Sequence, residues 1–459
     1  DRLLARLIAM SAAALAPGIA ATADPALETA ILDGSVIQRD MPVSLEGTAA
    51  PGSPVTIAFA GAPQTVEAGP DGRWAAELAP VQAGGPYTLR IKDSEGLLTV
   101  SDILVGDVFL CSGQSNMEFP VRRALNPDAE MPPEPDAALR LLDVPKVAAV
   151  APADTLPEGT RWQAASADTV GDFSALCYFT GRALREERRI PIGLIDSSWG
   201  GSQIEAWVPQ EALDATDLYD RALHQIELYR QDRQAAMADF GDAWESWWAE
   251  EHGSTPWTGE AAGEDWSPVP ADFSDWHTYD DEATRNHLGR LWYRKSFTLT
   301  KEEAEDGVSV SLGLFDDSDA TWLNGQFLGS TASWSDHRTY DVPEGVLKAG
   351  ENTFLINVLN TYGPGGMTGP AEVLALNRAS GDAIPLADGW EYRVVTQRDD
   401  GGPRPPWEAV SGYTTIHNAM VAPLAGLRFA GAIWYQGESN TGRPDEYGVL
   451  LEALIGAWR

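Results

Sequence analysis

Three short polar segments carry side chains whose types suit nucleophilic chemistry. The first is Gly113-Gln114-Ser115-Asn116-Met117, the second is Trp199-Gly200-Gly201-Ser202, and the third is Gln436-Gly437-Glu438-Ser439-Asn440. A serine hydroxyl attacks an ester carbonyl once a base has taken its proton. Paired glycines let a backbone N–H approach a ligand closely, as a donor to a developing oxyanion must. The residues therefore indicate acyl transfer, with Ser115 as the candidate nucleophile.

Each segment also has an ordinary structural interpretation. Ser115 could be a plain N-cap of a helix, the glycines could form a simple turn, and the third segment could be a solvated loop. The first segment also differs from the Gly-x-Ser-x-Gly nucleophile elbow, because Met117 occupies the final glycine position. What favours a common site is the position of all three segments relative to the predicted strands.

Each segment follows an apolar run that is typical of a strand buried on both faces. These runs lie at 103–111, 190–195 and 429–435, and a helix is predicted near 173–188. Strand, helix and strand in this order are the signature of a parallel α/β sheet. Open α/β sheets bind ligands at the carboxyl ends of their strands, so we expect the three segments to converge on one crevice.

The rest of the sequence predicts two β-rich domains beside the α/β fold. Short alternating runs between Gly and Pro turns indicate an Ig-like β-sandwich at 24–102. β character returns at 263–395, where Asn324-Gly325 is typical of a type I′ hairpin turn, and this part is predicted to be an inserted β jelly roll. The α/β domain would then consist of 103–262 and 396–459.

The first residues have the pattern of a processing signal. Arg2 and Arg6 flank a short apolar stretch that leads to Ala21-Thr22-Ala23, an A-x-A cleavage pattern. We expect 1–23 to be a signal peptide and the protein to be secreted or periplasmic, with a short buried helix as the alternative. No later apolar run reaches the ~18 residues of a membrane span, so no span is expected after removal of the signal.

Composition narrows the expected partners. The 459 residues carry a formal net charge of −36, which disfavours nucleic acid because no basic surface is available to displace counterions. The sequence lacks the common metal-binding and phosphate-loop motifs, so we expect no metal and no cofactor. Cys111 and Cys177 lie in apolar runs, and we expect two buried free thiols, with a bridge between them as the alternative.

Taken as a set, the three segments resemble the sialate O-acetylesterase family, which belongs to the SGNH hydrolase superfamily and is related to the acetyl xylan esterases. The segments occur in the family's order, and the flanking residues 105–120, 192–209 and 418–447 fit as well. The resemblance implies a parallel sheet sandwiched by helices, and hydrolysis of acetyl esters on an acetylated sugar or glycan. A sialate 9-O-acetylesterase is the expected activity. An acetyl xylan or other plant-glycan esterase and a non-catalytic glycan-binding protein are the alternatives.

The resemblance also implies roles for individual residues. Ser115 would be the nucleophile, and its N–H with that of Gly200 or Gly201 would form the oxyanion hole. A side chain of the third segment completes this hole in the superfamily. Gln436 and Asn440 are both candidates, and we favour Gln436 because it directly follows the strand. Supporting positions are assigned to Gln114, Asn116 and Glu438, of which Glu438 could orient either a donor or the base, and substrate contact is assigned to Trp199.

One departure from the family concerns the general base. The family uses a His in a D-x-x-H motif near the C-terminus, and no such motif follows Asn440. We therefore expect the catalytic His and Asp beyond residue 459. His417 stands where the family commonly has an aromatic residue, and we interpret it as structural or supporting. Without a base a serine is a weak nucleophile at neutral pH, so the chain as given is expected to be nearly inactive.

The inserted part resembles the galactose-binding-like jelly roll of glycosidases, on the residues of 316–325, Trp334, 338–340 and 350–352. Similar insertions occur among sialate O-acetylesterases, and in many relatives the module is structural. Whether it binds sugar stays open, and Trp322 and Trp334 are interpreted as packing aromatics.

Overall fold

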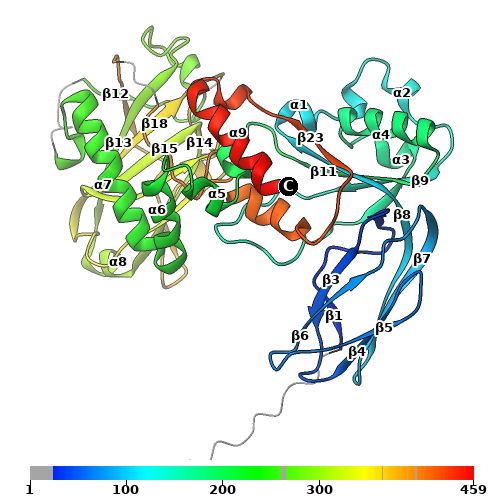
Figure 1. The fold of residues 1–459 in the computed structure, drawn as a ribbon. Coiled ribbons are helices and arrows are strands. Elements are labelled where there is room, and N and C mark those ends of the chain that lie inside the picture. Colours follow the sequence, from blue (N-terminus) through cyan, green and yellow to red (C-terminus); the bar gives the residue numbers. More distant parts are fainter. Residues whose placement is uncertain (1–23, 260–264, 364, 398–400) are drawn as a thin grey trace, which may run out of the picture.

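The structure, a computed structural model, describes residues 24–259, 265–363, 365–397 and 401–459, so the predicted signal peptide at 1–23 lies outside the described residues. Figure 1 shows an N-terminal β-rich part in blue, a central α/β part, and a second β-rich part in green and yellow. Among the described helices, none combines the length and the apolarity that a membrane crossing requires.

The N-terminal part packs two small sheets against each other. One contains β1 (Ala26–Leu27), β3 (Val43–Thr48) and β6 (Arg73–Leu78), and the other contains β4 (Pro54–Ala58), β5 (Gln64–Glu67), β7 (Gly84–Lys92) and the start of β8 (Leu97–Gly113). Buried and exposed residues alternate along β6, and Leu45, Ile57 and Trp74 lie in the common core. The period of two that predicted a sandwich is therefore what buries this core.

Strand β8 joins this part to the α/β sheet. Its 17 residues pair antiparallel with β7 at their start and parallel with β11 (Ile192–Ser198) and β23 (Gly431–Tyr435) at their end. The register of the β7–β8 pair shifts near Asp102, whose φ is 56°, as happens where a bulge bends a strand. The domain boundary predicted between 102 and 103 falls inside β8, and one continuous sheet therefore runs through both parts.

The α/β sheet has the order β10–β9–β11–β8–β23, with β10 (Trp162–Ala165) as an antiparallel edge and β9 (Asp136–Asp143) parallel to β11. Helices cover both faces. On one face α4 (Ala175–Arg188) packs through Cys177 and Tyr178, and on the other α9 (Pro444–Trp458) packs through Leu450 and Leu454. The predicted fold class, a parallel sheet between helices with added β domains, is confirmed.

Further elements lie between and after these strands. They are β2 (Val36–Gln38), α1 (Ser115–Glu118), η1 (Val121–Arg123), α2 (Pro127–Glu130), α3 (Ala167–Val170), η2 (Ile204–Trp207), α5 (Gln210–Asp214), α6 (Asp220–Gln231), α7 (Arg233–His252), η3 (Pro256–Thr258), η6 (His417–Val421), η7 (Ala422–Leu424) and η8 (Glu438–Asn440). The element that matters most for chemistry is α1, a single turn that begins two residues after β8 ends.

The second β-rich part has a larger and a smaller sheet. The larger contains β12 (Ser267–Pro268), β22 (Glu391–Val394), β13 (Gly289–Leu299), β18 (Gly350–Asn360), β15 (Ser318–Leu323) and β16 (Gln326–Ala332), and the smaller contains β17 (Arg338–Asp341), β14 (Gly307–Asp316), β19 (Gly366–Gly369), β20 (Ala375–Arg378) and β21 (Ala383–Pro385). α8 (Lys301–Asp306) connects a strand of the larger sheet to one of the smaller, whereas η4 (Trp276–Thr278) and η5 (Ala371–Val373) each lie between strands of one sheet. Asn324 and Gly325 have φ values of 53° and 84° between β15 and β16, which confirms the predicted type I′ turn.

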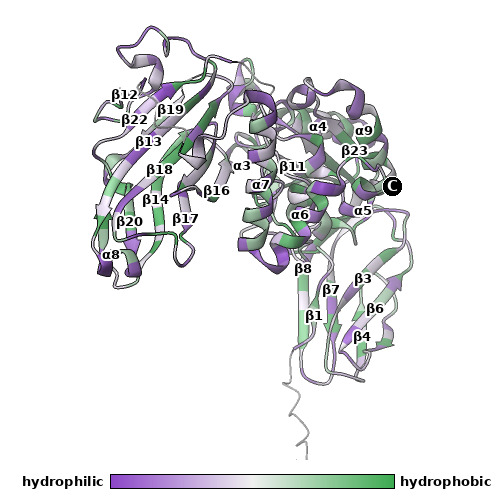
Figure 2. Cartoon of the chain, turned by 90° about the vertical axis from the view of Figure 1, so that its left-hand side faces the viewer, coloured by the Kyte–Doolittle hydropathy of each residue, from purple (hydrophilic) through white to green (hydrophobic). Residues whose placement is uncertain are grey.

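Helix α7 lies between the jelly roll and the rest of the molecule in Figure 2. Its Trp244 and Trp248 contact the jelly-roll residues Trp322 and Trp292, each with ring centroids 4.9 Å apart. Trp322 is fully buried, as expected for a packing aromatic, and its indole N–H donates to Glu245 at 2.8 Å. The same expectation is wrong for Trp334, which is 70% exposed because it lies in the loop after β16.

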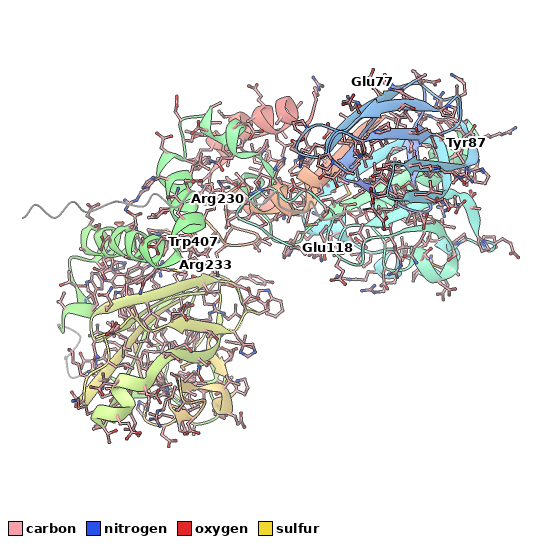
Figure 3. The ribbon with its side chains drawn as sticks, turned by 90° about the horizontal axis from the view of Figure 1, so that it is seen from below. Glu77, Tyr87, Glu118, Arg230, Arg233 and Trp407 are labelled. Atoms are coloured by element: carbon pink, nitrogen blue, oxygen red, sulfur yellow. A yellow bond between two sulfur atoms is a disulfide. The ribbon has the colours of Figure 1, made fainter. Side chains whose placement is uncertain are left out.

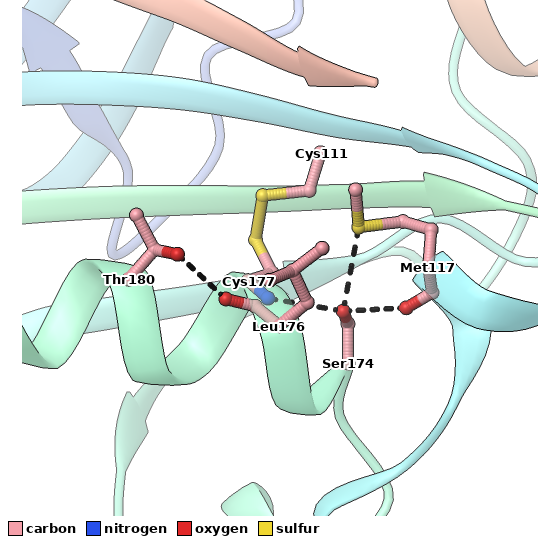
Figure 4. The surroundings of a disulfide bond; sticks show 6 residues. All are labelled: Cys111, Met117, Ser174, Leu176, Cys177 and Thr180. Atoms are coloured by element: carbon pink, nitrogen blue, oxygen red, sulfur yellow. Dashed lines mark hydrogen bonds between the residues drawn. A yellow bond between two sulfur atoms is a disulfide. The ribbon is translucent and has the colours of Figure 1, made fainter. Parts of the chain in front are cut away.

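The expectation of two free thiols is also wrong. Cys111 on β8 and Cys177 on α4 form a disulfide, with their Cα atoms 5.9 Å apart. Figure 4 shows this bond beside Ser174, whose hydroxyl donates to the carbonyl oxygen of Met117 at 2.6 Å and accepts the N–H of Cys177 at 3.2 Å. The helix crosses the sheet where the two cysteines face each other, a register that the sequence alone does not reveal. These contacts tie α4 to both β8 and α1.

We predict that reduction of this disulfide lowers the free energy of unfolding by about 2–4 kcal/mol, because the bond restricts the unfolded chain. Urea unfolding of the wild type, with and without reductant, measures the change. The double variant Cys111→Ala/Cys177→Ala is the control and should not respond to reductant. Equal stability of the oxidised and reduced wild type would contradict the prediction.

Candidate active site

The predicted nucleophile stands at the carboxyl edge of the sheet. β8 ends at Gly113, α1 begins at Ser115, and the side chain of Ser115 is exposed. Gln114, and not Ser115, is the N-cap of the turn, so the plain N-cap interpretation of Ser115 does not hold. As the first residue of a helical turn, Ser115 has an N–H with no acceptor inside the helix. Hydroxyl and N–H are therefore both available at the same edge.

The diglycine turn after β11 lies directly against Ser115. A Cβ added to Gly200 would lie 3.5 Å from the Cβ of Ser115 and 3.6 Å from its Cα. The N–H of Trp199 donates to the carbonyl oxygen of Gly113 at 2.9 Å, which holds the turn beside the end of β8. Gly201 has a φ of 78°, a value that favours glycine. The structure thus brings the first two segments together.

An ion pair that sequence reasoning missed borders the same turn. The N–H of Gly200 donates to Oε2 of Glu118 at 2.5 Å, and the other carboxylate oxygen of Glu118 is paired with the ammonium of Lys146. Glu118 follows Ser115 by three residues on α1, and this helical spacing was the available signal for its proximity. Lys146 follows β9 with no comparable signal in the sequence.

The third segment is tied to the first by side chains of the first. Oε1 of Gln114 accepts the N–H groups of Gly437 and Ser439 at 3.2 and 3.1 Å, and Nδ2 of Asn116 donates to Oε1 of Glu438 at 2.5 Å. Gln114 is buried, whereas Asn116 and Glu438 are exposed. All three residues that were assigned supporting positions therefore join the two segments.

Gln436 and Asn440 form a buried network with the second segment. Nε2 of Gln436 donates to the carbonyl oxygen of Ser202 at 3.0 Å and to Oδ1 of Asn440 at 2.7 Å, and Nδ2 of Asn440 donates to Oε2 of Glu205 at 2.8 Å. A primary amide has two N–H donors, so Gln436 has committed both. In this arrangement the two side chains hold the loop in position. Because neither N–H of Gln436 is left for an oxyanion, the preference for Gln436 as an oxyanion donor is not supported.

The remaining predicted residues lie around this arrangement. Trp199 is half-buried and packs against the core on the α9 face of the sheet. His417 is half-buried on η6, and burial lowers the pKa of its imidazole. In the described parts of the chain, no hydrogen bond joins a histidine to Ser115, and no cluster of three His, Cys, Asp or Glu side chains is arranged to hold a metal ion.

Two carboxyl groups that interact electrostatically with Glu118 lie on adjacent strands. Asp143 at the end of β9 is in register with Asp196 on β11. Asp196 is buried, and its Oδ1 has no hydrogen-bond partner among the described residues. Burial raises the pKa of Asp196 to about 8 and also raises the pKa of Asp143. Asp196 is therefore mostly uncharged at pH 7.

Comparison with known proteins matches two regions of the chain to families. Residues 105–238 match the model of a family described as carbohydrate esterase, sialic acid-specific acetylesterase. Residues 264–363 match the second all-beta domain of beta-galactosidase. The first match contains Ser115 and the diglycine turn, and the second contains most of the jelly roll.

Curated relatives share part of their length with this chain. The sialate O-acetylesterase of Mus musculus is 32% identical over 188 residues, which cover 37% of this chain and 34% of the relative. That of Homo sapiens is 32% identical over 206 residues, which cover 39% of each. The chain thus spans between a third and two fifths of these relatives. A solved carbohydrate acetylesterase from Xanthomonas citri is 22% identical, with 71% of this chain and 92% of that chain covered and a TM-score of 0.40.

We predict that Asp196→Asn gains stability relative to the wild type as pH rises from 5 to 8. The pKa of Asp196 is about 8 in the folded protein and 3.8 is its ordinary value. Between these pH values the wild type takes up a proton when it folds, so its free energy of unfolding falls by up to about 1.4 kcal/mol for each pH unit. The variant has no carboxyl group at this position and should not show this loss. Urea unfolding at successive pH values measures the difference. Parallel pH profiles of the two proteins would show that Asp196 does not titrate as stated.

Proposed function

We propose that the α/β domain, a member of the sialate O-acetylesterase family over residues 105–238, hydrolyses acetyl esters on sugars. The observation that carries this proposal is the exposed hydroxyl of Ser115 at the carboxyl edge of the sheet, with Gly200 directly against it. A nucleophile beside backbone donors is the minimum that acyl transfer requires. The assignment of the α/β domain to 103–262 and 396–459, around an inserted module, is part of the same proposal.

The proposed reaction has two steps. Oγ of Ser115 attacks the acetyl carbonyl carbon while a base takes the hydroxyl proton, and the carbonyl electron pair moves onto oxygen. The tetrahedral intermediate collapses, the sugar oxygen leaves with the proton from the base, and acetyl-Ser115 remains. Water then attacks the acetyl group, acetate leaves, and Ser115 recovers its proton. The balance needs no metal and no redox cofactor.

The oxyanion would be received by the N–H of Ser115 and by an N–H of the Gly200-Gly201 turn. Such donors are usually the largest contribution to catalysis because they are fixed before charge develops. Gln436 or Asn440 would add a third donor only after a change in their present hydrogen bonds. Trp199 is proposed to contact the substrate at the start of the turn. A histidine is proposed as the base that takes the proton of Ser115.

The substrate class follows from the family. Acetylated sialate is proposed as the substrate, acetyl xylan or another plant glycan is the second candidate, and the jelly roll is proposed as a structural module. We further propose that residues 1–23 direct export, so that the enzyme meets glycans outside the cytoplasm or in the periplasm.

We predict that a fluorophosphonate labels Ser115 in the full-length protein. Ser115→Ala should abolish the labelling, and the exposed jelly-roll serine variant Ser335→Ala should retain it, because the probe reacts only with an activated hydroxyl. Intact mass and peptide mass spectrometry measure both. A folded, unlabelled full-length protein would instead favour the non-catalytic glycan-binding alternative.

We predict that the full-length protein releases acetate from 9-O-acetylated sialate with a higher kcat/KM than from acetylated xylo-oligosaccharides. The difference should be at least tenfold, because binding contacts that suit one sugar leave polar groups unpaired with the other. The rate of acetate release, measured over a range of concentrations of each substrate, gives the two kcat/KM values. A higher kcat/KM for the xylo-oligosaccharides would leave the proposed ester hydrolysis in place and make acetyl xylan the preferred substrate class.

A further inference from the structure

The carboxylate of Glu118 lies where the proposed reaction needs an open donor. Its Oε2 accepts the N–H of Gly200 at 2.5 Å, and the same oxygen would lie 2.9 Å from a Cβ added to Gly200. That Cβ position is also 3.5 Å from the Cβ of Ser115. The carboxylate therefore lies on the side of the diglycine turn that faces the nucleophile. Figure 3 labels Glu118 in the α/β part, between the two β-rich parts in that view.

A carboxylate oxygen and a tetrahedral oxyanion are chemically similar acceptors. Both carry negative charge, and both form short hydrogen bonds with a backbone N–H. The N–H of Gly200 offers a single proton, so it cannot serve Glu118 and the acyl oxygen of a substrate in full at the same time. Occupation by one excludes the other.

The surroundings of Glu118 allow it to leave this position. Its side chain is 34% exposed, and that of its partner Lys146 is 42% exposed. A solvent-exposed ion pair of this kind contributes little to stability, so releasing the carboxylate into water has a small cost. The groups that face the pair are Asp143 and Asp196, and the latter is mostly uncharged at pH 7. Lys146 would then remain as a cation near the charge that develops on the acyl oxygen.

We propose that Glu118 is a competing carboxylate that occupies the Gly200 donor in the resting protein and is displaced by the acyl oxygen of the substrate. This inference rests on the proposed function, and it adds a residue that limits access to the oxyanion hole. If Glu118 only held the diglycine turn against α1, its removal would instead slow the reaction at Ser115.

The test is the rate at which a fluorophosphonate modifies Ser115 in the full-length protein. Glu118→Ala should be modified about three- to tenfold faster than the wild type, because the donor is free for the phosphoryl oxygen. Glu118→Gln should be intermediate, since its amide oxygen can still accept the N–H of Gly200 without the charge. Glu187→Ala on α4 removes an exposed carboxylate of the same domain and is the matched control, with the wild-type rate expected.

Acetate gives a second readout that a structural role would not move. As a carboxylate it should protect Ser115 of Glu118→Ala at a lower concentration than it protects the wild type. Slower modification of both Glu118 variants, with unchanged thermal unfolding, would overturn the inference and assign Glu118 to holding the turn. Failure of the probe to modify wild-type Ser115 at all would instead overturn the proposed function, and this inference with it.

Discussion

The close approach of β23 to the end of β8 is the constraint on which the site depends. Gly113 has a φ of 141°, and a Cβ added there would lie 2.1 Å from the carbonyl oxygen of Tyr435, so a side chain cannot be accommodated. The two parallel strands consequently end side by side. Gln114 then reaches across to the backbone of the third segment, and Ser115 is turned outward on α1. A glycine two residues before the nucleophile thus sets its orientation.

The supports of the site come from several directions. The disulfide ties α4 to β8, and Ser174 holds α1 from the α4 face. The N–H of Trp199 fixes the diglycine turn to Gly113, and the buried amides of Gln436 and Asn440 keep the third segment in place. Rigid support of this kind is what preorganised donors need, because catalysis is lost if they must reorganise during the reaction. Glu118 differs from these supports, because its side chain is 34% exposed and its ion pair with Lys146 is of a kind that contributes little to stability.

Local patterns predicted the strands that end in the three segments, since an apolar run is readable from neighbouring residues. They did not predict β9, where the buried Arg140 interrupts the apolar run and pairs with Asp102. They also gave the wrong state for Cys111 and Cys177, which are 66 residues apart, and missed the contact of Gly200 with Glu118 across 82 residues. Such pairs are set by how a helix or turn packs on the sheet, and a single sequence contains no direct record of that packing.

The most direct test of the account is a crystal structure of the full-length protein after reaction with a fluorophosphonate. The account predicts a phosphorus–oxygen bond to Ser115 and a phosphoryl oxygen about 2.7–3.1 Å from the N–H groups of Ser115 and the diglycine turn. An adduct on another residue, or a phosphoryl oxygen that points away from the Gly200-Gly201 backbone, would contradict it.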